Sequence, residues 1–231
     1  MAEPADTSVE SQEYPPELAR LPPGRHGLPR EFVVHNQRER LIAGLATAVA
    51  EKGYRAVTIT DVTKEARVSR RVFYENFEGK EECFLAAFEV VVGHIRELAM
   101  EAAASLTDWP EQAIAAARAV LGFFAAEPDL ARLCLVESQA AGPAVSARFH
   151  EAVQEVTPYL EQGRELRPGE RQLPPTTEES TLGALVLLAG RKVAAGEAEQ
   201  LGDLLPEFTE FILAPYLGAE AAGRLAHSQA A

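Results

Sequence analysis

Apolar side chains recur along this chain at intervals of three and four residues, the spacing that places side chains on one face of an α-helix. Leu41, Leu45 and Val49 show this pattern first, and Gly53 follows them. Glycine readily adopts the left-handed backbone conformation that ends helices. The pattern therefore predicts a helix over residues 35–52.

The helices that follow are predicted from capping residues and prolines. Thr58 or Thr60 can cap a short helix that ends near Ala66, and Ser69 can cap the next, because a hydroxyl oxygen accepts hydrogen bonds from the free N–H groups of a first turn. No stretch alternates apolar and polar residues as an exposed strand would. The remaining helices are predicted after Gly79 and over 110–126, 128–141, 143–166, 178–196 and 203–217.

Composition agrees with an all-α fold of about nine helices. Of the 231 residues, 47% are hydrophobic but only 7% are aromatic, so the chain can form a core without many of the residues that favour strands. No apolar run approaches the roughly 18 residues that span a bilayer. The N-terminal residues are acidic and polar, unlike a signal peptide. Cys83 and Cys134 stand alone, which predicts reduced thiols and a cytoplasmic protein without a membrane partner.

Charge is distributed unevenly. The net charge of −13 argues against a protein covered in positive charge for nucleic acid. Residues 20–80, however, hold 12 Lys and Arg against 7 Asp and Glu. A basic segment on an otherwise acidic chain is the expected electrostatic footprint of a local DNA contact.

The chain is predicted to have four parts. Residues 1–34 form an extended arm rich in proline, in which Arg20, Arg25 and Arg30 either track DNA or carry incidental charge. Residues 35–81 form a three-helix DNA-binding domain with a helix-turn-helix. Residues 82–220 form a second, larger helical domain. Residues 221–231 form a flexible tail.

The basic segment contains two short helices joined by a tight turn, which is the helix-turn-helix arrangement. Arg70 and Arg71 begin the second helix, where side chains can reach base edges in the major groove. An arginine can donate two hydrogen bonds to guanine O6 and N7. Tyr74 and Lys80 suit contacts with phosphates, which position a protein on DNA.

The run from Gly53 to Lys80 resembles the N-terminal domain of the TetR family of bacterial transcriptional regulators. The features that carry the resemblance are Gly-Tyr at the end of the first helix, Val-Ser in the turn, Phe-Tyr in the second helix and the trailing Lys80. The family often has glycine where this chain has Arg67. If the backbone there has a positive φ, arginine costs on the order of 1 kcal/mol.

The resemblance implies a role for each matching residue. Thr58 and Thr60 would bind phosphates at the start of the first helix of the motif, and Arg67 and Ser69 would lie in the turn at the DNA. Arg70, Arg71 and Val72 would read bases. Tyr74, Asn76 and Lys80 would clamp the phosphate backbone.

The resemblance also implies that the C-terminal bundle holds a small hydrophobic or amphipathic effector. The candidate ligand-binding residues are Phe123, Phe124, Cys134, Glu137, Phe149 and Val153. The alternative is that these residues are ordinary core. Glu137 follows an apolar run, so it is either exposed or buried with a partner such as Arg132 or Arg148.

The chemistry of an enzyme is not indicated. His94 and His150 lack the spacing of metal ligands, and no catalytic arrangement, phosphate-binding loop or cofactor site is evident. We therefore expect no cofactor and no metal. A helical-bundle enzyme remains a remote alternative.

Dimerisation follows from the small number of base pairs that one recognition helix can read. The two final predicted helices, 178–196 and 203–217, are apolar on more than one side, and Gly183, Ala184 and Gly190 would allow close approach across a two-fold axis. Taken with this dimerisation, the resemblance to the TetR family implies a homodimeric repressor on a palindromic operator, released by an effector. A DNA-binding regulator without a small ligand is the alternative.

Overall fold

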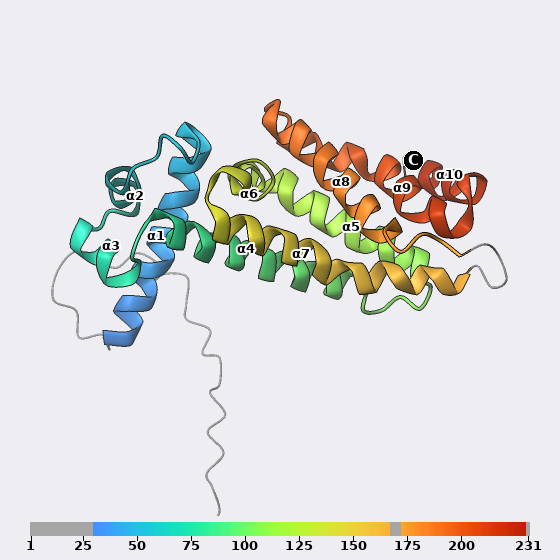
Figure 1. Ribbon diagram of the computed structural model, residues 1–231, viewed down its shortest axis with the longest axis horizontal. Coiled ribbons are helices and arrows are strands. Elements are labelled where there is room, and N and C mark those ends of the chain that lie inside the picture. The colour runs from blue at the N-terminus through green and yellow to red at the C-terminus, as the bar shows by residue number, and fades with distance from the viewer. Residues whose placement is uncertain (1–29, 167–171, 230–231) are drawn as a thin grey trace, which may run out of the picture.

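The computed structural model describes residues 30–166 and 172–229, and all regular structure in these ranges is helical. Figure 1 shows a small group of helices at one end of an elongated body, with α4 (Lys80–Ala103) running from the first part into the second. The all-α prediction is confirmed. The predicted arm lies almost entirely outside the described residues.

The N-terminal domain consists of α1 (Arg30–Lys52), α2 (Ile59–Ala66) and α3 (Arg70–Asn76). Its apolar faces meet in one core with the start of α4. A Cβ at Gly44 would lie 2.8 Å from the backbone nitrogen of Ala66, so α1 and α2 approach at a distance that only glycine permits. The fully buried side chains of this core include Leu41, Leu45, Val49, Val62, Phe73 and Phe84.

Within the described residues, the body contains seven helices around a second part of the same apolar core. They are α4, α5 (Trp109–Ala126), α6 (Pro128–Leu135), α7 (Pro143–Glu161), α8 (Thr177–Ala194), α9 (Leu205–Leu217) and α10 (Ala219–Ser228). Short 3₁₀ segments join them: η2 (Glu137–Ala140), η3 (Gln162–Leu166) and η4 (Ala198–Leu204). No helix in the part of the chain that is described is long and apolar enough to cross a membrane.

Helices α4 and α7 lie side by side and run in the same direction (Figure 1). Near the N-terminal domain, Glu81 Oε1 accepts a hydrogen bond from the Ala144 N–H in the first turn of α7, at 3.1 Å. Further along, Arg148 Nε donates to Glu89 Oε1 at 2.6 Å. Polar contacts therefore tie α7 to the helix that leaves the N-terminal domain.

Several predicted boundaries differ from the structure. Helix α1 begins at Arg30, so the expected arm ends before residue 34. The segment predicted as one helix over 128–141 is divided at Val136 into α6 and η2. The flexible tail predicted from residue 221 is instead helical up to Ser228, because Ala222 and Ala226 are buried where α10 packs on α9.

A buried ionic cluster holds the end of the body farthest from α3 in Figure 1. The Glu178 carboxylate is fully buried and accepts hydrogen bonds from Arg164 Nε at 2.9 Å and from the Tyr216 hydroxyl at 2.9 Å. Arg164 also donates to the carbonyls of Leu173 and Pro174. The cluster thus joins η3, the start of α8 and α9.

The pKa of Glu178 is lowered in this cluster. Burial alone would raise it, but the hydrogen bonds from Arg164 and Tyr216 and the charge of Arg164 outweigh that effect. Burial and the Glu178 carboxylate together raise the pKa of Tyr216. The carboxylate is therefore ionised in the folded protein at neutral pH, with its charge compensated by Arg164.

Both cysteines are buried. Burial raises the pKa of the Cys83 thiol to about 12 and raises that of Cys134 as well. At neutral pH both are therefore protonated thiols, which are poor nucleophiles.

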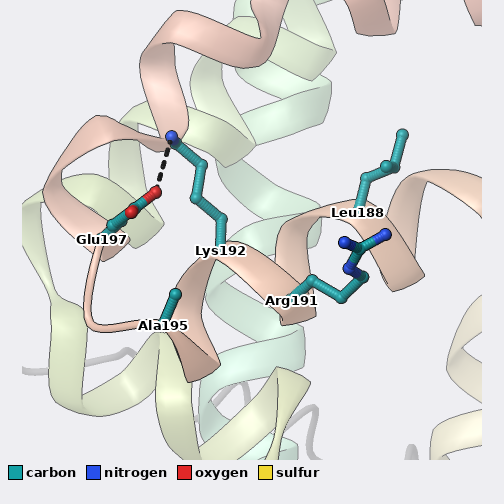
Figure 2. Close-up of a pocket in the computed structure, with 5 residues that line it drawn as sticks. All are labelled: Leu188, Arg191, Lys192, Ala195 and Glu197. Carbon is teal, nitrogen blue, oxygen red and sulfur yellow. Dashed lines mark hydrogen bonds and ion pairs between the residues drawn. The ribbon is translucent and has the colours of Figure 1, made fainter.

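The C-terminal end of α8 carries a shallow hollow of about 290 Å³ (Figure 2). Lys192 Nζ lies 3.2 Å from Glu197 Oε2 at its rim. Leu188, Arg191 and Ala195 complete its lining. The hollow is small and mainly bordered by charged side chains.

We expect Glu178→Gln to lower the free energy of unfolding at pH 7 by about 3 kcal/mol, because it leaves Arg164 without a charged partner. Since the folded-state pKa of Glu178 lies below 4.5, the wild-type advantage is complete above about pH 4.5 and declines as the pH falls further. Urea unfolding of both proteins across this range, at one protein concentration, measures it.

Glu179→Gln is the matched control, since Glu179 is the exposed neighbour of Glu178 on α8. It should change stability little at any pH. A Glu178→Gln deficit of the same size at pH 3 and pH 7 would contradict the assigned titration.

Candidate functional site

The second helix of the helix-turn-helix, α3, presents a polar face to the surface. Its N-cap is Ser69, whose Oγ accepts a hydrogen bond from the Val72 N–H at 3.3 Å. Arg70, Arg71 and Tyr74 are exposed, whereas Phe73 on the opposite side is fully buried. The core therefore orients α3 so that its arginines face outward.

The predicted base-reading residues differ in their surroundings. Arg71 Nε donates to Glu75 Oε1 at 2.7 Å, and this hydrogen bond raises the pKa of the guanidinium. Arg70 is exposed at the first position of the helix, and Val72 is half-buried. Because the Arg71–Glu75 pair is exposed to water, it is worth little energy and leaves Arg71 able to exchange Glu75 for a base.

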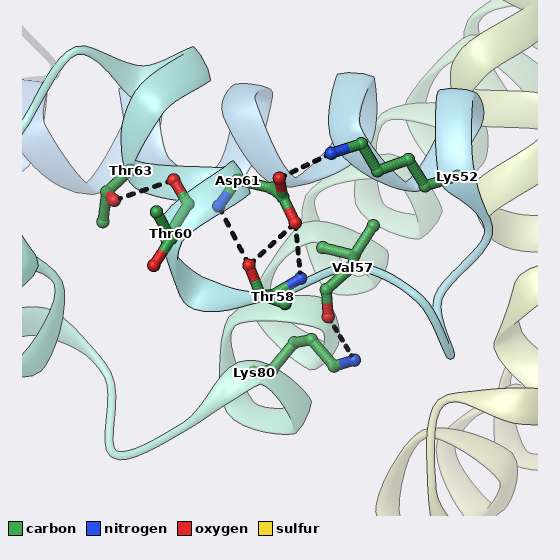
Figure 3. Close-up of polar contacts among 7 residues, drawn as sticks. All are labelled: Lys52, Val57, Thr58, Thr60, Asp61, Thr63 and Lys80. Atoms are coloured by element: carbon green, nitrogen blue, oxygen red, sulfur yellow. Dashed lines mark hydrogen bonds and ion pairs between the residues drawn. The ribbon is translucent and has the colours of Figure 1, made fainter.

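Helix α2 begins with a capping box that uses both Thr58 and Asp61 (Figure 3). The Thr58 hydroxyl donates to Asp61 Oδ2 at 2.7 Å, and the same oxygen accepts the Thr58 N–H at 2.9 Å. Lys52 pairs with the other carboxylate oxygen, and together these contacts lower the pKa of Asp61. The hydroxyl of Thr60 lies exposed beside this cap, as a phosphate contact requires.

Two of the predicted phosphate ligands are occupied inside the domain. Lys80 Nζ donates to the carbonyls of Tyr54, at 2.6 Å, and Val57, at 2.7 Å, and lies 4.1 Å from the centre of the Tyr54 ring. Its partial burial lowers the pKa. The Asn76 amide donates to the Val72 carbonyl at 2.8 Å. Lys80 has one N–H left for a phosphate, and Asn76 would use its second.

The turn between α2 and α3 contains Arg67 in the left-handed conformation, with φ 53° and ψ 45°. No other residue except glycine has a positive φ in the described ranges. The Arg67 side chain is exposed, and its carbonyl accepts a hydrogen bond from Arg40 of α1 at 3.0 Å. The turn thus places a strained but outward-pointing arginine next to Ser69 and Arg70.

A groove of about 560 Å³ lies between α6, α7 and α8. Its size is within the range of small-molecule sites. Apolar side chains line most of its wall: Leu135, Val136, Phe149, Val153, Val186 and Leu187. Polar groups from Gln139, His150, Gln154, Glu179 and Arg191 border it.

The structure brings together only two of the six predicted ligand-binding residues in this groove, Phe149 and Val153. Phe123 and Phe124 pack together on α5, with the Phe123 ring 5.1 Å from His94 of α4. Cys134 is buried. Phe123, Phe124 and Cys134 therefore lie in or against the hydrophobic core, which was the alternative to a ligand-binding role.

Glu137 is buried and has partners outside the groove. Arg132 donates to its Oε1 at 3.0 Å, and the Tyr54 N–H donates to its Oε2 at 2.9 Å. Of the two expected partners Arg132 is therefore present, whereas Arg148 pairs with Glu89 and Glu155 instead.

The polar border of the groove is not among the residues predicted from the sequence. His150 and Gln154 directly follow Phe149 and Val153, so they share the same side of α7 four residues apart. That spacing could have indicated them. Arg191 comes from α8, and only the packing of α8 beside α7 brings it near.

An exposed apolar stripe follows α8. Leu187 is 63% exposed, and Gly183 and Ala194 lie on the same side of the helix, together with the exposed Arg191. Phe211 of α9 is 50% exposed. Gly190 was expected to allow the approach of a second copy of the chain. Instead it allows a close approach within the chain, because a Cβ there would lie 3.1 Å from the Leu135 carbonyl oxygen.

The N-terminal domain is similar to domains of known regulatory proteins. Residues 41–87 match the family described as bacterial regulatory proteins, tetR family. A 60-residue segment is 33% identical to the uncharacterised HTH-type transcriptional regulator YerO of Bacillus subtilis (strain 168). That match covers 26% of this chain and spans only about a fifth, 21%, of the relative.

Solved structures resemble the larger part of the fold. The fatty acid degradation regulator FadR from Bacillus halodurans matches with a TM-score of 0.68 and 18% identity, over 77% of this chain and 94% of that one. FadR from Bacillus subtilis, in complex with stearoyl-CoA, matches with a TM-score of 0.64 and 16% identity, over 78% and 98%. At these identities the likeness concerns the fold.

We expect Arg67→Gly to stabilise the protein by about 1 kcal/mol, because glycine removes the Cβ clash of the left-handed conformation. Thermal unfolding followed by circular dichroism measures the change. Arg67→Ala is the matched control, since alanine removes the same charged side chain but keeps the Cβ. If glycine and alanine changed stability equally, the backbone strain assigned to position 67 would be wrong.

Proposed function

Because the chain belongs to the TetR family of bacterial regulatory proteins, we propose that it regulates transcription by binding an operator as a homodimer. The relatives that it matches are regulators and not enzymes. The observation that carries the proposal is the orientation of α3, with Phe73 in the core and an arginine pair exposed at its first turn.

In this proposal α3 enters the major groove of the operator. Arg70 and Arg71 donate to guanine O6 and N7, and Val72 contacts the adjacent bases. The hydroxyls of Thr60 and Tyr74 bind phosphates, together with the free N–H groups of Lys80 and Asn76. Thr58 and Ser69 act mainly as caps that hold the two helices of the motif, because both side chains accept a backbone N–H there.

We propose that the dimer forms through the outer faces of α8 and α9. Leu187 and Phe211 are large apolar side chains exposed on these helices, and an exposed apolar patch is typical of an interaction surface. Gly183 has no atom within 4 Å of the Cβ it lacks, so a second copy of the helix can approach there. Two copies would present two recognition helices to a palindromic operator.

The groove between α6, α7 and α8 is the proposed effector site. Its apolar wall suits an aliphatic or aromatic group, and Arg191 and His150 at its border suit an anionic head. Stearoyl-CoA, which the B. subtilis FadR structure contains, is an amphipathic molecule of this kind. The hollow in Figure 2 is a weaker candidate, because it is half as large and bordered by the Lys192–Glu197 ion pair.

The proposed mechanism is repression relieved by the effector. Since Leu187 and Gly183 belong both to the groove and to the apolar stripe of α8, a ligand there would favour one arrangement of the two subunits over another. An effector that prefers an arrangement with wrongly spaced recognition helices weakens operator binding. Regulation without a small ligand is the second candidate, since DNA binding itself needs no groove.

We expect Arg70→Ala and Arg71→Ala each to weaken binding to the DNA upstream of the protein's own gene by about tenfold or more. The double variant should lose specific binding and remain a dimer. Fluorescence anisotropy at one salt concentration measures affinity, and light scattering measures the assembly. Arg224→Ala, which removes an exposed arginine from α10, is the control. Unchanged affinity in the double variant would contradict the base-reading role.

We expect an amphipathic acid with a long apolar chain to raise the melting temperature of the wild-type protein, because it binds the folded state. Fatty acyl-CoA molecules of different chain length are the probes. Val153→Trp fills the groove and should remove the shift, whereas Val156→Trp, on the outer side of α7, should keep it. A shift retained in Val153→Trp places the ligand elsewhere. No shift with any probe favours regulation without such a ligand.

A further inference from the structure

Glu137 reaches from the body into the DNA-binding domain. It is the first residue of η2, two positions after the end of α6, and is 8% exposed. Its carboxylate accepts the Tyr54 N–H at 2.9 Å, across 83 positions in sequence. A Cβ at the preceding residue, Gly53, would lie 3.4 Å from Oε1, so the carboxylate also packs against the loop between α1 and α2.

Tyr54, whose N–H binds Glu137, is also held by residues of α4. The Tyr54 carbonyl accepts a hydrogen bond from Lys80 Nζ, and the Tyr54 ring packs edge-on against Phe84 with centroids 5.2 Å apart. Tyr54 therefore has its N–H bound to η2 and its carbonyl bound to the first residue of α4. The α2 cap at Thr58 follows four residues later, so the position of Tyr54 sets where the helix-turn-helix begins.

The other side of the same segment borders the groove. Leu135, Val136 and Gln139 line it, and the Leu135 carbonyl is in contact with Gly190 of α8. Ser138 Oγ donates to the Cys134 carbonyl at 2.7 Å, which holds the turn closed. Residues 135–139 thus touch the groove and α8 on one side and, through Glu137, the DNA-binding domain on the other.

We propose that Glu137 is a positioning residue for operator recognition, acting through its hydrogen bond to Tyr54. It fixes the orientation of each DNA-binding domain on the body and thereby the distance between the two recognition helices of a dimer. This inference rests on the proposed function. Arg132 has the separate role of compensating the buried carboxylate, because an unpaired charge at 8% exposure would be costly.

A loss of fixed domain orientation and a general loss of stability change operator affinity in different ways. A dimer with fixed domains prefers one separation of the two half-sites, because only that separation places both α3 helices in the major groove. If the domains could reorient freely, this preference should be weaker. The affinity should then fall less when the separation of the half-sites is changed. A general loss of stability would lower the affinity for every separation by the same factor.

The experiment measures the binding of the full-length protein to a set of duplexes. Each duplex carries the operator identified upstream of its own gene, with the half-sites moved apart or together by one to three base pairs. Glu137→Ala removes the acceptor, and Glu137→Gln keeps the size but loses the charge that pairs with Arg132. Arg132→Gln is the matched control, because it removes the other partner of the carboxylate and leaves the Tyr54 hydrogen bond possible.

We expect the wild-type protein and Arg132→Gln to prefer one separation strongly. In Glu137→Ala the ratio of affinities between the best and the altered separations should fall by about fivefold or more, with Glu137→Gln between the two. Hydrogen exchange of the peptide that contains Tyr54 should be faster in Glu137→Ala, and its circular dichroism spectrum shows whether the helices remain.

Two results would overturn the inference. One is a wild-type separation profile in a folded Glu137→Ala protein, with or without a uniform loss of affinity. The other is an equal loss of preference in Arg132→Gln, which would mean that compensation of the charge, and not the contact with Tyr54, matters. Absence of wild-type binding to every duplex would instead contradict the proposed function on which the inference rests.

Discussion

The contact on which the arrangement of the two domains depends is the one between Lys80 and the loop that follows α1. Its ammonium group binds the carbonyls of Tyr54 and Val57 and faces the Tyr54 ring. Lys80 is also the first residue of α4, which runs from the N-terminal domain into the body (Figure 1). Any motion of α4 is therefore passed directly to the start of the helix-turn-helix, without a flexible linker between them.

Local sequence signals predicted the DNA-binding domain well. The limits of α3 and its Ser69 cap agree with the structure, because a cap and the helix it starts are determined by residues only three positions apart. The energetic cost of a positive φ at Arg67 could be predicted for the same reason, because a short turn has few backbone conformations. The N-terminal domain is thus the part where spacing alone carries most of the information.

The body could be predicted only as a set of helices. Five of the six expected ligand residues are apolar, but Phe123, Phe124 and Cys134 share that property with the core, and only packing separates core from groove. Arg132, five residues from Glu137, could be expected as its partner, but the second partner, the Tyr54 N–H, lies 83 residues away in the chain, beyond any periodic pattern. The helix α10 was not predicted, although Ala222, Leu225 and Ala226 follow helical spacing and form the face that packs against the body.

The burial of both native thiols has a practical consequence for studying this protein. Cys83 and Cys134 are the only cysteines in the chain, and both are inaccessible and protonated at neutral pH. A cysteine introduced on the exposed face of α3 or α8 is therefore the single reactive thiol of the chain, with no background mutations required. Spin labels or fluorophores attached there can report distances within the proposed dimer in the otherwise unaltered protein.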